Sequence, residues 1–98
     1  MKRLIVAAGL VQCLAGCAST PLTSSGSQVH VVQQDQLKRC LQVQYISVSL
    51  PFGSAEAAHN EALNRAAAAG GDSIYIYFTW SDPLRGSQVQ GEALNCRT

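Results

Sequence analysis

The sequence predicts a small α+β domain of split β-α-β-β type, with one helix on a mixed sheet of three strands, or of four if a short leading strand joins it. Residues 40–50 and 73–80 alternate apolar and polar side chains, as half-buried strands do. Residues 55–69 between them are rich in alanine and carry helix capping signals on both sides. A cysteine stands at each end of this region, Cys40 and Cys96, and the pair predicts a disulfide across the fold.

The leading strand is predicted in residues 28–32, "QVHVV", where β-branched residues alternate with others. Residues 33–39 are polar and predict a connection. In residues 40–50, "CLQVQYISVSL", the apolar phase changes between Tyr45 and Ile46. This change predicts either a bulge or a strand that uses both faces.

The helix is predicted from Ser54, in the N-cap position, to the Gly70-Gly71 pair, which supplies a left-handed C-terminal cap. Glu61 and Arg65 form a favourable i,i+4 pair. The predicted buried side is almost entirely small and consists of Ala58, Ala62, Ala66 and Ala69, with Leu63 nearby. Such a face lets the helix approach the sheet closely, so the sheet must supply most of the core volume.

Residues 73–80, "SIYIYFTW", predict the second long strand, and residues 88–96 predict a third that returns as a hairpin. One face of the second strand is assigned to the core: Ile74, Ile76, Phe78 and Trp80. The other face carries Tyr75, Tyr77 and Thr79 and is the candidate interaction surface, because a single helix leaves one sheet face uncovered and tyrosine is enriched at interfaces. The alternative is an ordinary solvated face with good β-formers.

The disulfide also predicts the strand order. A right-handed crossover makes the first two long strands parallel, and the hairpin makes the third antiparallel to the second. Cys40 and Cys96 then lie at the same end of the sheet, and a disulfide requires Cα atoms within about 7 Å. Neighbouring strands lie about 4.8 Å apart, and strands with another strand between them lie roughly twice as far apart. The first and third strands must therefore be neighbours, which favours the third strand between the other two, in the order 1-3-2.

The amino terminus predicts an exported lipoprotein. Lys2 and Arg3 precede an apolar run that is too short to span a bilayer, as in a secretory signal peptide. Residues 14–17, Leu-Ala-Gly-Cys, match the bacterial lipobox, in which the cysteine is alkylated with diacylglycerol and the signal is removed before it. We therefore expect residues 1–16 to be removed and Cys17 to carry the lipid, which would hold the protein stably at a membrane. The alternative is a chance cysteine beside an ordinary cleavage site.

Three segments follow from this interpretation: the signal peptide 1–16, the lipidated cysteine with a flexible Ser/Thr/Gly-rich tether 17–27, and the folded domain 28–98. Removal of the signal leaves Cys40 and Cys96 as the only unassigned cysteines. It also leaves five basic residues against six acidic ones. A nearly neutral domain offers no electrostatic footprint for nucleic acid, so no nucleic-acid partner is expected.

The lipobox, the "AHNEALNRAAAAGGDSI" stretch and the closing "GEALNC" together resemble a family of small bacterial envelope lipoproteins whose best-known relative is the RcsF outer-membrane stress sensor. The resemblance covers about residues 28–98. This chain differs from the stress sensor in having cysteines for one disulfide instead of two and in having a much shorter tether. It implies a domain that faces the periplasm and acts by protein binding, structural support or envelope-stress signalling. Ala18 after the anchor, where aspartate resembles an inner-membrane retention signal, implies the outer membrane.

An alternative function is a small periplasmic enzyme or ligand-binding lipoprotein that uses the region of His59 and Asp72. The residues around His59 match neither a zinc-protease motif nor a catalytic triad signature. His30 and His59 have no further histidine or cysteine at metal-ligand spacing. We therefore expect no catalytic residues, no metal and no cofactor. A deep pocket that joins His59 to Asp72 would favour the alternative.

Overall fold

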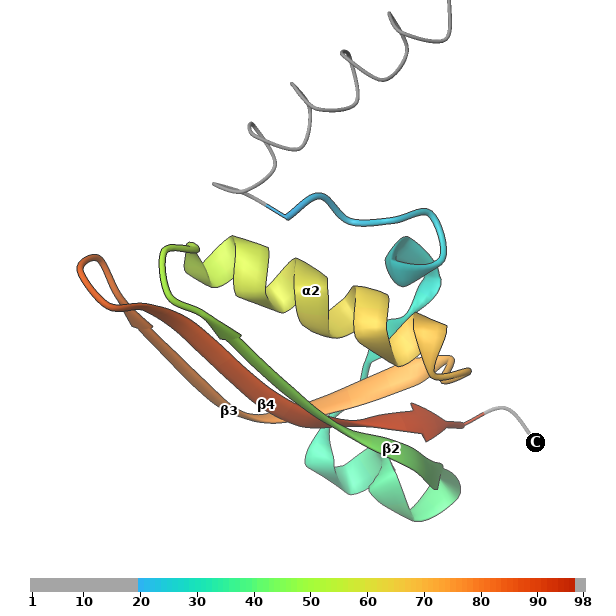
Figure 1. Ribbon diagram of the computed structural model, residues 1–98. Coiled ribbons are helices and arrows are strands. Elements are labelled where there is room, and N and C mark those ends of the chain that lie inside the picture. Colours follow the sequence, from blue (N-terminus) through green and yellow to red (C-terminus); the bar gives the residue numbers. More distant parts are fainter. Residues whose placement is uncertain (1–19, 97–98) are drawn as a thin grey trace, which may run out of the picture.

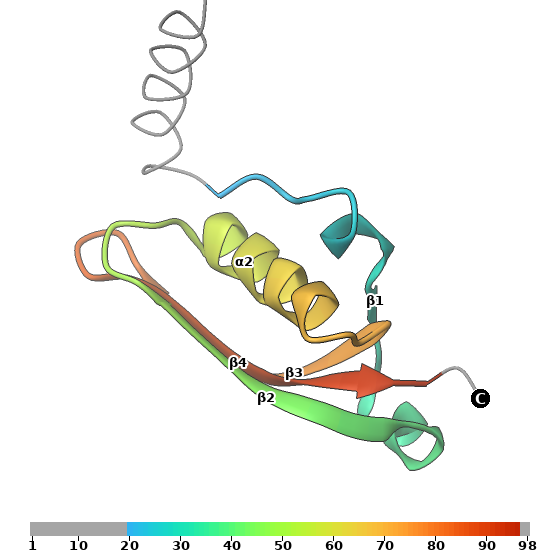
Figure 2. The same cartoon turned by 45° about the vertical axis from the view of Figure 1, so that its right-hand side comes forward.

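The structure is a computed structural model that describes residues 20–96, and the predicted signal peptide 1–16 and the predicted lipidation site Cys17 lie outside the described residues. The elements are η1 (Gly26–Gln28), β1 (His30–Val31), η2 (Gln34–Arg39), β2 (Leu41–Leu50), α2 (Ala55–Ala68), β3 (Ser73–Asp82) and β4 (Gly86–Asn95). Helix α2 lies across one face of a strongly twisted sheet, and η2 lies on the other side of that sheet (Figures 1 and 2). The predicted α+β class is confirmed.

The sheet has four strands in the order β1-β3-β4-β2. Strand β4 pairs antiparallel with both β2 and β3, so β2 and β3 run parallel on either side of it. The three long strands thus have the arrangement that the disulfide argument predicts. The predicted order 1-3-2 nevertheless leaves out the short β1, which pairs parallel with β3 through His30↔Ser73 and Val31↔Ile74 and makes the sheet four-stranded.

The Cys40–Cys96 disulfide closes the end of the sheet where β2 begins and β4 ends. Leu41 pairs with Asn95 across these strands, which brings the two cysteine Cα atoms to 4.1 Å. The carboxylate of Asp72 accepts a hydrogen bond of 2.9 Å from the backbone N–H of Cys96. The same residue's backbone carbonyl accepts from the N–H of His30, at 3.0 Å. Asp72 therefore joins the ends of β1 and β4 beside the disulfide.

The helix begins and ends where its capping residues predict. Ser54 Oγ accepts a hydrogen bond of 3.1 Å from the Ala57 N–H. At the other end Gly70 has a φ of +92°, which favours glycine, and the N–H of Gly71 donates to the Ala66 carbonyl at 2.9 Å. Arg65 forms the expected ion pair with Glu61, at 2.7 Å.

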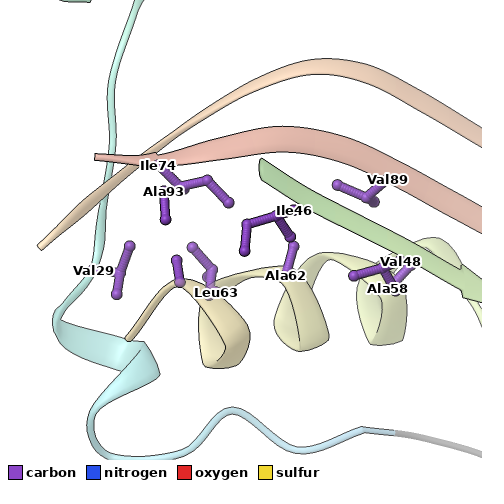
Figure 3. Close-up of a cluster of buried hydrophobic side chains, with 10 residues drawn as sticks. Val29, Ile46, Val48, Ala58, Ala62, Leu63, Ile74, Val89 and Ala93 are labelled. Carbon is purple, nitrogen blue, oxygen red and sulfur yellow. The ribbon is translucent and has the colours of Figure 1, made fainter. Parts of the chain in front are cut away.

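The core lies between the alanine side of α2 and the sheet (Figure 3). On the helix, Ala58, Ala62 and Ala66 are fully buried, as predicted, whereas Ala69 is only partly buried. The sheet supplies the larger side chains, which include Ile46, Val48, Ile74 and Val89. The prediction that the helix contributes small residues to the core and the sheet contributes the larger ones is confirmed.

A β-bulge in β3 overturns part of the predicted face assignment. Ile76 pairs with Gly91 on β4, and Phe78 pairs with Gln90, the residue adjacent to Gly91. Tyr77 is therefore the extra residue. A bulge shifts the alternation of side chains by one position. Phe78 and Trp80 were predicted in the core, and this prediction is wrong: they are 43% and 40% exposed.

Residues 20–27 also differ from the prediction of a flexible tether. Two asparagine side chains on α2 hold this segment along the helix, on the side away from the sheet (Figure 1). Gly26 is buried within it, where η1 begins. Composition suggested no fixed structure because the segment has little apolar surface to bury. It is ordered instead by hydrogen bonds from partners about 40 residues away in the sequence.

Candidate interaction surface

The strand pairing and the ring contacts assign five aromatic residues to the sheet face opposite α2, and we call them the aromatic face: Tyr45, Tyr75, Tyr77, Phe78 and Trp80. Residues directly opposite each other in an antiparallel pair share a face. Both Tyr45 and Tyr75 pair with Glu92, while the neighbouring residue Ala93 is buried on the helix side. By the same alternation, Phe78 and Trp80 share this face with Gln90 and Gln88.

The three tyrosines form a cluster that reaches across β4. The ring centroids of Tyr45 and Tyr77 are 6.4 Å apart and the rings are stacked, with an interplanar angle of 28°. The rings of Tyr75 and Tyr77 are 6.1 Å apart and tilted by 42°. Both separations fall in the range that aromatic pairs prefer. Tyr77, the bulged residue, is thus the centre of the cluster and links β2 and β3, the strands on either side of β4.

The face is exposed and nearly uncharged. Tyr45 and Tyr77 are 49% and 46% exposed, so two neighbouring aromatic rings present much of their surface to solvent. Partial desolvation raises the pKa of the Tyr77 hydroxyl above its ordinary value, and the neighbouring Tyr45 and Glu92 raise it further. Tyr77 therefore stays protonated at neutral pH and can both donate and accept a hydrogen bond.

Only two of the three predicted surface residues lie on the aromatic face. Tyr75 and Tyr77 lie on the open face as predicted, but Thr79 does not. Its cross-strand partner is the buried Val89, so it lies on the helix side of the sheet, where it lines a pocket beside His59. The inclusion of Thr79 was wrong because the bulge at Tyr77 reverses the alternation that the assignment assumed.

Three further residues of this face were not predicted from the sequence: Tyr45, Phe78 and Trp80. Gly91 was the available signal, because a glycine inside a strand often marks a bulge or a close backbone approach. An added Cβ at Gly91 would collide with the Tyr75 carbonyl oxygen, so β3 approaches β4 at this point as only glycine allows. For β2, the register is continuous at the predicted phase change, since Tyr45 and Ile46 pair with the adjacent residues Glu92 and Gly91, so the strand uses both faces there. A separate register shift lies between Gln42 and Gln44.

His59 and Asp72 lie near opposite ends of α2 and line different pockets. His59 borders a cavity of about 230 Å³ together with Thr79 and Val89 of the helix side, and the adjacent strand positions Trp80 and Gln88 complete its edge. Asp72 borders another of about 210 Å³ beside Gly71. The side chain of Asp72 holds Cys96, as described above, and also accepts from Ser73 Oγ at 2.9 Å.

Residues 20–96 contain no group of three or more His, Cys, Asp or Glu side chains arranged to hold a metal ion. Within the same range, no helix has both the length and the apolar character needed to cross a bilayer. Comparison with protein-family models, with curated proteins and with solved structures gave no match to this chain.

Proposed function

We propose that this protein is a lipid-anchored envelope lipoprotein, similar in kind to the RcsF stress sensor, that binds a protein partner on its periplasmic side through the aromatic face. The observation that carries the binding role is the cluster of three partly exposed tyrosines, with Phe78 and Trp80 also exposed, on the sheet face opposite α2. The lipobox at residues 14–17 supports the anchor. The disulfide supports an oxidising compartment, since such bonds persist outside the cytoplasm.

The composition of the aromatic face favours a protein partner. Tyrosine, tryptophan and phenylalanine are enriched at protein interfaces, whereas charged residues are depleted at their centres. Between the aromatic residues, the central strand β4 carries Gln88, Gln90 and Glu92, and β2 carries Ser47 and Ser49. The face thus combines aromatic rings with side chains that donate and accept hydrogen bonds, and protein interfaces use both kinds of group.

The Cys17→Ser variant tests the anchor. We expect it to be released in soluble form or to keep its signal peptide, because serine offers no thiol for the thioether bond. Membrane fractionation and mass spectrometry of the processed chain provide the measurement, and Cys13→Ser is the matched control. In a source with two membranes, the native protein should co-sediment with outer-membrane markers. Normal processing and membrane attachment of Cys17→Ser would contradict the lipoprotein assignment.

The Tyr75→Ser/Tyr77→Ser variant tests the aromatic face. We expect crosslinking to the partner to fall at least tenfold, since loss of an interfacial aromatic anchor costs about 2 kcal/mol or more. The measurement is in-cell photocrosslinking from position 78, with identification of the captured protein by mass spectrometry. The control is Phe52→Ser, which removes an aromatic ring that is 91% exposed in the turn before α2. Equal capture by both variants would place the interface elsewhere.

The alternative of a periplasmic enzyme or ligand-binding lipoprotein would use the cavity beside His59. This cavity is lined mainly by apolar surface and includes Thr79 and Val89. Asp72 would not contribute to it, because it lies beyond the far end of α2. A His59→Ala variant that loses a ligand while it keeps partner capture would favour this alternative.

A further inference from the structure

The segment that follows the lipobox is fastened to helix α2 by two asparagine side chains. Asn60 Nδ2 donates to the Thr20 carbonyl and Asn64 Nδ2 donates to the Pro21 carbonyl, both at 3.0 Å. Asn64 Oδ1 accepts from the backbone N–H of Thr23 at 2.9 Å and from the Thr23 hydroxyl at 3.0 Å. One amide thus satisfies three groups of the segment, an arrangement that fixes both its position and its direction.

Gly26 completes this attachment. A Cβ at this position would overlap Asn64 Oδ1 and come within 3.2 Å of the Asn64 Cα. The Gly26 N–H donates to Thr23 Oγ1 at 2.9 Å, so the turn and the asparagine bind the same threonine. The segment then enters η1, and Val29 packs into the core. Residues 20–29 are therefore held to the domain at both ends, by hydrogen bonds to α2 at one end and by the packing of Val29 at the other.

This attachment leaves very little free tether if Cys17 carries lipid, so the inference rests on the proposed function. Only Ala18 and Ser19 separate Cys17 from the bonded Thr20. Three Cα-to-Cα steps reach at most about 11 Å. The segment lies on the outer side of α2, and the sheet lies on its inner side (Figure 2). Because each layer is about 10 Å deep, the aromatic face is about 20 Å further from the segment.

We propose that Asn60 and Asn64 form a clasp that sets the orientation of the domain on the membrane. The clasp holds the α2 side toward the lipid surface and turns the aromatic face toward the periplasm. Residues 20–28 carry no charged side chain, and the exposed Leu22 lies among them, so this segment can approach lipid headgroups without burying a charge. The partner of the aromatic face then approaches from the aqueous side of the membrane.

The clasp is tested first in the native lipoprotein in detergent micelles. Asn64→Ala should make the Thr23 amide exchange its hydrogen about tenfold faster, because the net contribution of one hydrogen bond corresponds to roughly that factor. Alanine favours helix, so α2 is retained. Gly26→Ala should have the same effect by steric overlap. Asn95→Ala and Ser25→Ala are the matched controls. Unchanged Thr23 exchange in both Asn64→Ala and Gly26→Ala would overturn the clasp.

The orientation is tested in vesicles whose lipids carry a spin label on the headgroup. Trp80 is the single tryptophan of the chain and lies on the aromatic face, so it is a natural reporter. We expect its fluorescence to be largely retained in the native lipoprotein. In the Leu22→Trp/Trp80→Phe variant, the new tryptophan should lose most of its emission. Adding Asn60→Ala/Asn64→Ala to each reporter should remove most of this difference.

The outcomes separate the two levels of the proposal. Equal quenching of both reporters, or stronger quenching of Trp80, would overturn the orientation while the anchor stands. A difference that persists after loss of both asparagines would show that the clasp does not set it. Failure of the native protein to associate with vesicles would instead overturn the lipid anchor and the orientation together, and the Thr23 exchange would still decide whether the clasp exists.

Discussion

Replacement of both Cys40 and Cys96 by serine is expected to lower the free energy of unfolding by about 4 kcal/mol on the chain-entropy estimate. The disulfide joins residues with a sequence separation of 56, so its loss releases a loop that includes β2, α2, β3 and β4. Small domains have total stabilities of about 5–15 kcal/mol, and this one has a core built largely of alanine and valine. We therefore expect the variant to be mostly unfolded or only marginally folded at 37 °C.

Urea denaturation followed by circular dichroism provides the measurement. Treatment of the native protein with a reducing agent is the matched control, because it opens the same loop without changing any other residue. Both samples should show the same lowered midpoint, and the serine variant should not respond further to the reducing agent. A midpoint unchanged in both would mean that the sheet pairing of Leu41 with Asn95 already holds this end of the domain.

The elements whose signals are local could be predicted from the sequence. Ser54, Gly70 and the Glu61–Arg65 pair act through contacts within a few residues, and each performs the predicted role. The disulfide also made one long-range feature predictable, because one covalent bond between distant residues restricts the possible strand orders. The central position of β4 follows from that restriction together with the right-handed crossover and the hairpin.

The features that could not be predicted depend on contacts between distant segments. The bulge at Tyr77 is set by the register of β3 against β4, and nothing within residues 73–80 interrupts their alternation. That single extra residue moved Phe78 and Trp80 to the open face and Thr79 to the helix side. Likewise, the order of residues 20–27 is produced by Asn60 and Asn64, which local composition does not reveal.

The Ala62→Leu variant is expected to destabilise the protein by about 1–3 kcal/mol, the usual cost of overpacking a filled core. Ala62 is fully buried at the middle of α2 and points at Ile46 on β2 (Figure 3). The cavities beside His59 and Asp72 are not lined by Ala62, so they offer no space to the added carbons. The helix would have to move away from the sheet, which would also loosen Ala58 and Ala66.

Ala68→Leu is the matched control for Ala62→Leu, because it makes the same change on the same helix at an exposed position. Leucine and alanine have similar helix propensities, so the control separates overpacking from any effect on the helix itself. Thermal denaturation of the two variants should show a lowered midpoint for Ala62→Leu and little change for Ala68→Leu. Equal midpoints would mean that the helix can shift without cost and that the alanine side does not fix its distance from the sheet. Since the clasp lies on the outer side of α2, a shifted helix would carry the clasp with it, so Thr23 exchange should stay slow in both variants.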